Sequence, residues 1–389
     1  MVAETAREFE ALEEQARTLL GVFIKAGHEA VAPAVIQPAD VYLDVIGESL
    51  RGRSYVFLDP DGDELCLRPD LTVPTCRLHI ERHRNGDRPA KYCYNGTAFR
   101  FQPVGAGAAH PREFRQAGIE SFGIADREKA DAATLALVFE GLRTAGLKDF
   151  KLRIGDLGLF RALLEAADMP ARWRQRLMHQ FWRPDAFRTE LMRLTQSPAD
   201  TPGGVPNELL AQLDPEKPDE AVQLVSNYLD SEDIEIVGAR TVGEVTDNLL
   251  MVVADQRAEP LSPRTAALIS SYIGVTAPAR AAGARLKDLM GSEGVDISDA
   301  LDAYHRRLQL LTEAGVDVVH ADFSAEFGRT LEYYTGFVFE VIVPMLGEAS
   351  PVAGGGRYDK LIRMCGAPHD VPAVGGAVHT ERLLAAVRG

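Results

Sequence analysis

Residues 328–343 read GRTLEYYTGFVFEVIV, and the fold of the chain turns on how this stretch is interpreted. β-Branched and aromatic residues dominate it, which predicts one long β-strand. The period of two divides its centre between two faces, with Tyr334, Gly336 and Val338 on one and Tyr333, Thr335 and Phe337 on the other. A glycine beside a tyrosine leaves an open space on a sheet. That space suits either a pocket with a phenol on its wall or the close packing of a helix.

Length and charge limit what surrounds this strand. A chain of 389 residues is too long for one ordinary core, so we expect two domains or one domain with a large insertion. Against 42 Lys and Arg stand 57 Asp and Glu, which gives a formal net charge of −15. That balance disfavours nonspecific binding to nucleic acid or to an anionic membrane surface.

The N-terminus and the cysteines indicate the compartment. The first 15 residues, MVAETAREFEALEEQ, are acidic and lack the apolar core of a signal peptide. No later run approaches the roughly 18 apolar residues of a membrane span. The four cysteines contain no C-x-x-C spacing, which favours isolated buried thiols over zinc ligands or disulfides: Cys66, Cys76, Cys93 and Cys365. We expect a cytoplasmic protein without a metal or other cofactor.

Local patterns predict several elements in the first part of the chain. Apolar residues recur at spacings of three and four from Phe9 to Phe23, and Gly27 follows, which predicts a helix with a glycine stop. Residues 54–68 carry two short apolar runs around DPDGD, a hairpin signal. Two further strands are predicted at 90–103 and 112–124, separated by the glycine-rich loop VGAGAAHP. These two strands carry many polar side chains for a sheet, which suggests a site, since a buried charge must find a partner.

The middle of the chain has a different texture. Between 159 and 315, stretches with helical spacing alternate with breakers such as SPADTPGGVP. This part is predicted to be a mostly helical insertion. The β-rich texture returns afterwards, so residues 1–158 and 316–389 are predicted to complete one sheet and one domain.

Six short stretches resemble, in order, the catalytic core of histidyl-tRNA synthetases: LRPDLTVP at 67–74, FRFQP at 99–103, REFRQAGIESFG at 112–123, GRTLEYYTGFVFE at 328–340, GGGRYDKL at 354–361 and AVGGAVHTERLL at 373–384. The resemblance runs from about Gly27 to the C-terminus. The YYTG…FE and GGRYD stretches are specific to the histidine-binding members of the class. The implied fold is α+β: a class II aminoacyl-tRNA synthetase core, with an antiparallel sheet flanked by helices, usually dimeric.

The same resemblance implies a histidine pocket. Asp70 and Thr72 match the carboxylate and hydroxyl that hold the substrate ammonium, although the family usually has Glu at the first position. Gln116 and Glu120 match a polar pair inside the pocket and share one strand face, because they are four residues apart. The remaining matches are Tyr334 and Tyr358 around the imidazole with Tyr333 beside them, Arg329 facing the substrate carboxylate, and Arg100, which we count with this set. These residue types suit an ammonium, a carboxylate and an aromatic ring.

The nucleotide side departs from the family pattern. Arg100, which the resemblance assigns to the α-phosphate, is present, but Gln102 replaces the glutamate that reads adenine. His110 falls at an arginine of the family's GRxR pattern, although Arg112 remains. His379 replaces a glycine that gives ATP room, while Arg382 survives. At His379, a larger side chain at a glycine position blocks a ligand. With the changes at Gln102 and His110, the resemblance therefore implies a degraded nucleotide site, made up of Gln102, His110, Arg112, His379 and Arg382.

The C-terminus separates two branches of the family. A histidyl-tRNA synthetase continues into an anticodon-binding domain, whereas this sequence stops seven residues after Arg382. We therefore expect no anticodon-binding domain and no tRNA partner. The sequence closely resembles the truncated, non-catalytic branch, the regulatory subunits of short-form ATP phosphoribosyltransferase in histidine biosynthesis. This implies histidine as effector, a catalytic subunit that needs the chain for activity and feedback inhibition, and a homodimer within a hetero-octamer.

Two other functional hypotheses stay open. The first is a histidine-adenylating ligase with a non-tRNA acceptor, since the surviving arginines Arg100, Arg329 and Arg382 are groups that adenylation needs. The second is a scaffold with an empty pocket, which would not respond to histidine at all.

Two weaker motifs have structural interpretations. His79 and His83 stand four apart on a predicted helix and suit a metal, but no third ligand follows at a suitable spacing. The VGAGAAHP loop lacks the Lys and Ser/Thr of a phosphate-binding P-loop, so it is predicted to be a flexible lid.

Overall fold

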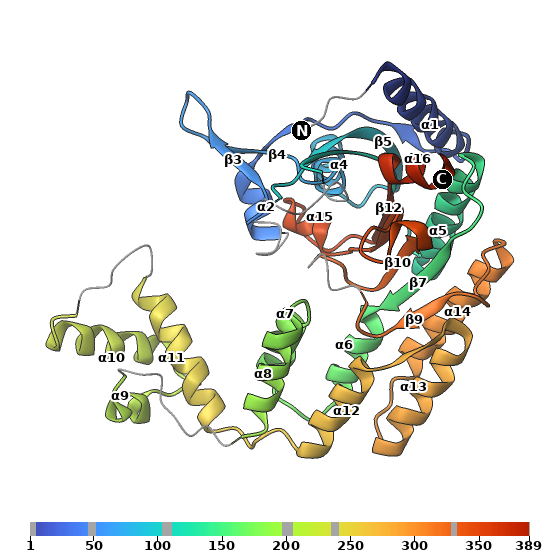
Figure 1. Cartoon of the computed structure of the whole chain (residues 1–389). Helices are drawn as coiled ribbons and strands as arrows, with labels where there is room; N and C mark the ends of the chain where they lie inside the picture. The colour runs from blue at the N-terminus through green and yellow to red at the C-terminus, as the bar shows by residue number, and fades with distance from the viewer. Residues whose placement is uncertain are drawn as a thin grey trace. The chain divides into compact units, whose positions relative to one another are not determined.

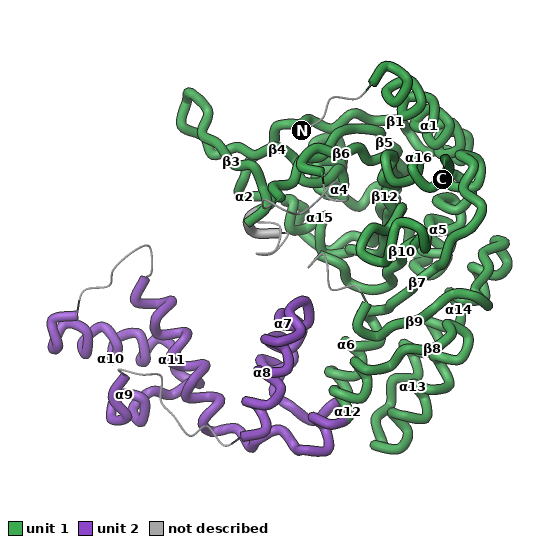
Figure 2. The backbone as a smooth tube through the Cα atoms, viewed as in Figure 1, with its two compact units in different colours: residues 1–166, 268–389 green, residues 167–267 purple. Residues whose placement is uncertain are grey.

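A computed structural model describes residues 5–45, 52–102, 111–196, 205–234, 241–327 and 333–388. The chain divides into two compact units, Met1–Ala166 with Leu268–Gly389 and Ala167–Ala267 (Figure 2). Residues 268–315 therefore belong with the first unit, and the second unit is shorter than the predicted insertion at 159–315.

A nine-stranded sheet organises the first unit, in the order β1-β5-β6-β12-β11-β10-β7-β9-β8. Its strands are β1 Glu29–Ala30, β5 Ala90–Phe99, β6 Glu113–Phe122, β7 Lys151–Asp156, β8 Thr276–Pro278, β9 Asp322–Ser324, β10 Phe337–Ile342, β11 Ala353–Arg357 and β12 Ala373–His379. The C-terminal strand β12 lies between β6 and β11, so strands from the two ends of the chain are neighbours (Figure 1). Strands from the first and last parts of the chain therefore share this sheet, which also includes β8 from the predicted insertion.

The sheet is antiparallel in its centre and mixed at its ends. β5 and β6 pair antiparallel over their full lengths, and β6, β12, β11, β10 and β7 continue in the same way. β1 pairs with β5 in parallel, as does β9 with β7. The expected antiparallel sheet is therefore found in the centre, and the parallel pairs lie toward the two ends.

Helices from both ends of the chain pack together on this sheet. α1 Ala6–Lys25 contacts α5 Arg127–Thr144 and α16 Thr380–Arg388, and α14 Ser298–Glu313 also packs on α5 (Figure 1). α1 is the predicted first helix: Thr5 and Glu8 form a capping box at its start, and Gly27 follows its end with a φ of 87°. Its apolar stripe is buried, including Leu19 and Phe23.

A small sheet and short helices complete the first unit. β2 Ile36–Pro38, β4 Glu64–Leu67 and β3 Tyr55–Leu58 pair in that order, and the predicted hairpin at 54–68 is confirmed as β3 and β4. Asp59 closes the turn, because its Oδ1 accepts hydrogen bonds from the main-chain N–H of both Asp61 and Asp63 at 2.9 Å. The remaining elements are α2 Ala39–Val45, α4 Thr72–Arg82, α6 Leu157–Ala166, α13 Ala279–Glu293, the 3₁₀ helix η1 Pro344–Leu346 and α15 Leu361–Met364.

The strand predicted at 328–343 is shorter than expected. β10 begins only at Phe337, residues 328–332 lie outside the described residues, and Tyr333 to Gly336 precede the strand. The expected alternation of the two tyrosines therefore fails, and both line the same cavity. The physical reason is a long-range hydrogen bond: the Thr335 hydroxyl accepts from the Asp359 N–H at 3.0 Å, a contact that periodicity does not reveal.

The second unit is helical in every element that the structure describes for it. Its helices are α7 Ala171–Gln180, α8 Pro184–Leu194, α9 Asn207–Gln212, α10 Pro218–Ser231 and α11 Val242–Gln256, and α12 Pro263–Ile273 crosses into the first unit. Asp255 joins α11 to α7 by accepting from Arg172 and from the Trp173 indole, both at 2.7 Å. Across the described ranges of both units, no helix is long and apolar enough to span a membrane.

Candidate functional site

A cavity of about 1140 Å³ opens in the first unit, at the centre of the large sheet. Most of the residues predicted for the two halves of the site line it: Asp70, Thr72, Arg100, Gln102, Gln116, Tyr333, Tyr334, Tyr358, His379 and Arg382. Glu120 lies directly behind Tyr358. Arg329 and His110 lie outside the described residues, as do residues 104–110 of the predicted lid VGAGAAHP at 104–111. Arg112 is exposed and does not line the cavity; its guanidinium donates to the Gln102 carbonyl at 3.1 Å.

Three tyrosines form one aromatic wall of the cavity. The Tyr333 ring centroid lies 4.9 Å from that of Tyr334 and 5.7 Å from that of Tyr358, the latter in an edge-to-face arrangement. Burial raises the pKa of each phenol well above its ordinary value. All three therefore stay protonated and retain a hydroxyl donor.

Glu120 holds the wall from behind. This carboxylate on β6 is 1% exposed and accepts hydrogen bonds from the hydroxyls of Tyr94, at 2.9 Å, and Tyr358. Burial raises its pKa to about 7, and hydrogen bonds from Tyr358, Thr72 and Tyr94 oppose that rise. Glu120 is therefore a buried acceptor that fixes the direction of two phenols.

Two buried side-chain oxygens that belong to residues lining the cavity have no hydrogen-bond partner. Asp70 precedes α4 and accepts at Oδ1 from the Val73 N–H at 3.1 Å, while its Oδ2 is buried without a hydrogen bond. Gln116 Oε1 is buried in the same way. Burial raises the pKa of Asp70, and the nearby Arg100 and main-chain N–H groups oppose the rise. An unpaired buried acceptor costs about 1–3 kcal/mol, so a cationic donor that reached these oxygens would bind favourably.

The predicted nucleotide side is built around Phe114. The Arg100 guanidinium lies 5.1 Å from the Phe114 centroid, and the His379 ring lies 5.4 Å from it on β12. Burial lowers the pKa of His379 well below its ordinary value, helped by the positive charges of Arg382 and Arg100. His379 is therefore a neutral ring between two arginines.

Tyr94 is a site residue that the sequence analysis missed. It donates to Glu120 and lies opposite Gly118, where a β-carbon would come within 2.6 Å of the Tyr94 hydroxyl oxygen. The signal was available in the two predicted strands, because a glycine on the same strand as Glu120, two residues before it, leaves room for a large partner.

His79 is held by hydrogen bonds, and the four cysteines are free thiols. Both ring nitrogens of His79 are occupied, Nε2 by the Gly86 carbonyl at 2.9 Å and Nδ1 by the Tyr92 hydroxyl at 3.3 Å. In the part of the chain that the structure describes, no group of three or more His, Cys, Asp or Glu is placed to hold a metal. All four cysteines are free; Cys365 is half-buried and close enough to Cys76 for a thiol hydrogen bond, so these two are not isolated.

Comparison with known proteins matches residues 5–237 and 246–383 to a family profile described as histidyl-tRNA synthetase. Among curated proteins, the ATP phosphoribosyltransferase regulatory subunit of Chelativorans sp. (strain BNC1) is 33% identical over 360 residues, covering 92% of each chain. The subunit of the same name from Rhizobium rhizogenes is 32% identical over 377 residues, covering 96% of this chain and 97% of that protein.

Two solved structures resemble the fold. The first, an ATP phosphoribosyltransferase regulatory subunit/histidyl-tRNA synthetase from Bacillus halodurans, has a TM-score of 0.68 at 20% identity and covers 100% of this chain and 82% of that one. The second, a histidine–tRNA ligase subunit from Alicyclobacillus acidocaldarius, has a TM-score of 0.60 at 23% identity and covers 100% of this chain and 96% of that one. At these identities, the structures bear on the fold alone.

Proposed function

This chain belongs to the histidyl-tRNA synthetase family and, within it, to the ATP phosphoribosyltransferase regulatory subunits, and on that premise we propose that it binds free histidine and regulates a short-form catalytic subunit. The observation that carries the proposal is the cavity itself. Supporting it are the unpaired buried acceptors of Asp70 and Gln116, which line the same cavity as the three tyrosines.

Each group of histidine has a complementary partner in this arrangement. The ammonium is assigned to Asp70, Thr72 and Gln116, because it supplies the donors that the buried oxygens lack. The imidazole is assigned to the tyrosine wall in front of Glu120. The carboxylate is assigned to arginine, either Arg100 or the sequence-predicted Arg329.

The nucleotide side favours a regulator over an enzyme. His379 occupies the position that the family pattern gives to glycine, and its half-buried neutral ring lies 5.4 Å from that of Phe114. A glycine there would leave space for an adenylate. We propose that the degraded nucleotide site, defined by Gln102, His110, Arg112, His379 and Arg382, makes this chain non-catalytic.

Regulation is then a coupling between histidine binding and a conformational equilibrium of the complex. Histidine in the cavity would stabilise one of two arrangements of the assembled complex, by a coupling free energy of typically 1–3 kcal/mol. The assembly is proposed to be cytoplasmic: a hetero-octamer in which this chain forms homodimers, is needed for catalytic activity, and transmits feedback inhibition.

Reconstitution tests the proposal directly. Phosphoribosyl transfer from phosphoribosyl pyrophosphate to ATP is measured with a short-form catalytic subunit alone, with this chain added, and with histidine added to the mixture. Activity should appear only in the mixture and fall with histidine. No activation, with both proteins folded, would overturn the regulatory proposal.

A histidine-adenylating ligase with a non-tRNA acceptor is the second candidate. It is favoured by Arg100 and Arg382, which both line the cavity and could balance the charge of a transferred phosphate. Histidine-dependent exchange of pyrophosphate into ATP by this chain alone would support it, and absence of exchange would exclude it.

A further inference from the structure

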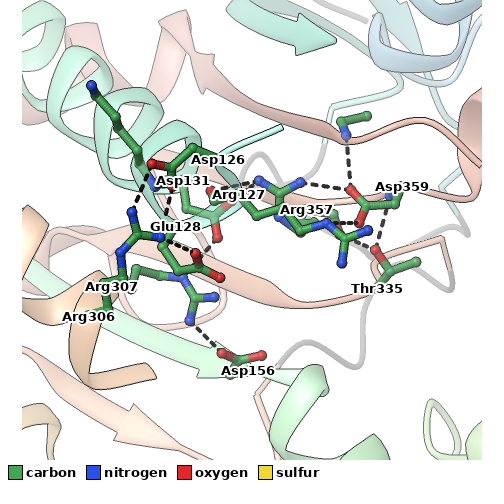
Figure 3. Close-up of polar contacts among 12 residues, drawn as sticks. Asp126, Arg127, Glu128, Asp131, Asp156, Arg306, Arg307, Thr335, Arg357 and Asp359 are labelled. Atoms are coloured by element: carbon green, nitrogen blue, oxygen red, sulfur yellow. Dashed lines mark hydrogen bonds and ion pairs between the residues drawn. The ribbon is translucent and has the colours of Figure 1, made fainter. Parts of the chain in front are cut away.

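Two short segments carry Tyr334 and Tyr358 and are joined by hydrogen bonds of Thr335 with Arg357 and Asp359, an arrangement called here the Thr335 lock. Tyr334 is followed by Thr335, and Tyr358 stands between Arg357 and Asp359. Thr335 N–H donates to the Arg357 carbonyl at 2.7 Å, and the Thr335 hydroxyl donates to the same carbonyl at 3.3 Å. Asp359 N–H donates back to the Thr335 hydroxyl at 3.0 Å. Hydrogen bonds among Thr335, Arg357 and Asp359, the residues next to the two tyrosines, therefore join the two segments (Figure 3).

The Arg357 side chain also supports the Thr335 lock, through its contacts with Gly336 and two carboxylates. It passes under Gly336, where a β-carbon would lie 3.3 Å from the Arg357 Cδ. Its Nη1 donates to Asp359 Oδ1 at 2.8 Å and its Nη2 donates to Asp131 Oδ1 at 2.6 Å. The open space beside the glycine of the TG pair is thus filled by an arginine that joins the tyrosine segments to α5.

Asp131 is shared between two arginines. It has no exposed surface, and its second oxygen accepts from Arg307 Nε at 2.8 Å. Arg307, on α14, also donates to Asp156 Oδ2 at 2.5 Å at the end of β7. Burial raises the pKa of Asp131 and the two guanidiniums oppose the rise; since arginine stays protonated, the carboxylate stays ionised between them.

A purely structural role does not require this network. Buried ion pairs are often no more stabilising than well-packed apolar residues of similar volume, because both partners lose their hydration. α5 already packs through Leu135, Val138 and Leu142, which are fully buried. The charged groups additionally fix the orientation of the elements, since each guanidinium donates to two carboxylates in defined directions.

We propose that Asp131 is a positioning residue for the cavity. Through Arg357 it fixes the Thr335 lock, which holds the segments of Tyr334 and Tyr358. Through Arg307 it connects these segments to α14. The ligand in this inference rests on the proposed function. The fixed position of the tyrosines does not, and the two are tested separately.

The first measurement is histidine affinity by calorimetry. Thr335→Val keeps the shape of the side chain but removes the hydroxyl contacts, and Asp131→Asn removes the shared charge. Each should weaken binding by about tenfold or more, a change of roughly 1.4 kcal/mol, whereas Thr335→Ser, which keeps the hydroxyl, should restore near wild-type affinity. Arg306→Ala is the matched control: it removes the neighbouring arginine on α14, which pairs with Asp126 and Glu128 and is about half exposed. Its affinity should be unchanged.

The second measurement needs no ligand. In protein with ¹³C-labelled tyrosine rings, assigned with Tyr334→Phe and Tyr358→Phe, Thr335→Val should shift or broaden the Tyr334 and Tyr358 resonances and leave Tyr55 on β3 in place. If Asp131→Asn does not fold, Thr335→Val carries the test alone. Unmoved Tyr334 and Tyr358 resonances in folded Thr335→Val would overturn the inference. If Thr335→Val moves these resonances but the wild-type protein does not bind histidine, the positioning role is retained and the proposed ligand is overturned.

Discussion

Glu120 on β6 and Gly375 on β12 are register partners, and a β-carbon at position 375 would overlap the Glu120 carboxylate. The glycine therefore keeps open the space in which this acid meets Tyr94 and Tyr358. Any side chain at 375 must displace the carboxylate or separate the strands.

Gly375→Ala should destabilise the protein by about 1–3 kcal/mol through overpacking and weaken histidine binding at least tenfold. Thermal unfolding and calorimetry measure the two effects. Gly291→Ala on α13 is the control, because nothing lies within 4 Å of the added methyl; there alanine should be neutral or stabilising by about 0.5–1 kcal/mol. Equal behaviour of the two variants would contradict the assigned role of Gly375.

Glu120→Ala should leave the Tyr94 and Tyr358 hydroxyls without their buried acceptor, at a cost of about 1–3 kcal/mol per unpaired group. Histidine affinity should fall with it, because the tyrosine wall loses its orientation. Glu120→Gln keeps one acceptor oxygen and should be milder. Wild-type affinity in the alanine variant, measured by calorimetry, would remove Glu120 from the site.

The raised pKa of Glu120, about 7 against an ordinary 4.5, gives a pH dependence with a definite sign. As the pH rises through this window, the unfolded chain gives up the proton while the folded protein keeps it, so stability is lost with rising pH. In denaturant titrations between pH 4.5 and 7, Glu120→Gln should therefore show a shallower fall in the free energy of unfolding. Glu340 is half-buried, and its pKa, also raised to about 7, contributes in the same direction. Glu340→Gln measures its share, and an unchanged slope for Glu120→Gln would contradict the assignment.

His379 should prevent nucleotide binding. Ligand that binds only the folded state raises the unfolding temperature, so ATP with histidine should not stabilise the wild-type protein beyond histidine alone. His379→Gly removes the ring from beside Phe114 and should allow ATP to add stabilisation. Clear stabilisation of the wild-type chain by ATP would contradict a degraded nucleotide site.

Local patterns in the sequence predicted the local parts of the fold. The α1 helix, the β3–β4 hairpin and the long strands β5 and β6 follow from periodicity and turn residues, because their stabilising contacts lie within or between neighbouring segments. The order of the large sheet did not follow from any local pattern. That order was not predicted. The fold class came through the resemblance, and the predicted class II synthetase-like fold and family are confirmed by the family profile, the curated relatives and the structural neighbours.

Long-range hydrogen bonds explain what the sequence did not predict. Tyr333 and Tyr334 read as alternating strand residues, whereas the Thr335 lock with Arg357 turns both toward the cavity. Arg357 and Asp131 are 226 residues apart, so no spacing rule brings them together. Ion pairs between arginines and carboxylates far apart in the chain produce no periodic spacing in the sequence. The network in Figure 3 is therefore seen only in the three-dimensional structure.

The place of β12 between β6 and β11 has a consequence for synthesis of the protein. Tyr358 and Glu120 are 238 residues apart, and β12 supplies the glycine opposite Glu120 only after both have been made. Pairing over such distances is slow, since the chain loses much entropy before any contact forms. While translation is in progress, β6 has an unpaired edge, and a nascent chain released before β12 leaves the ribosome has no complete cavity for an effector.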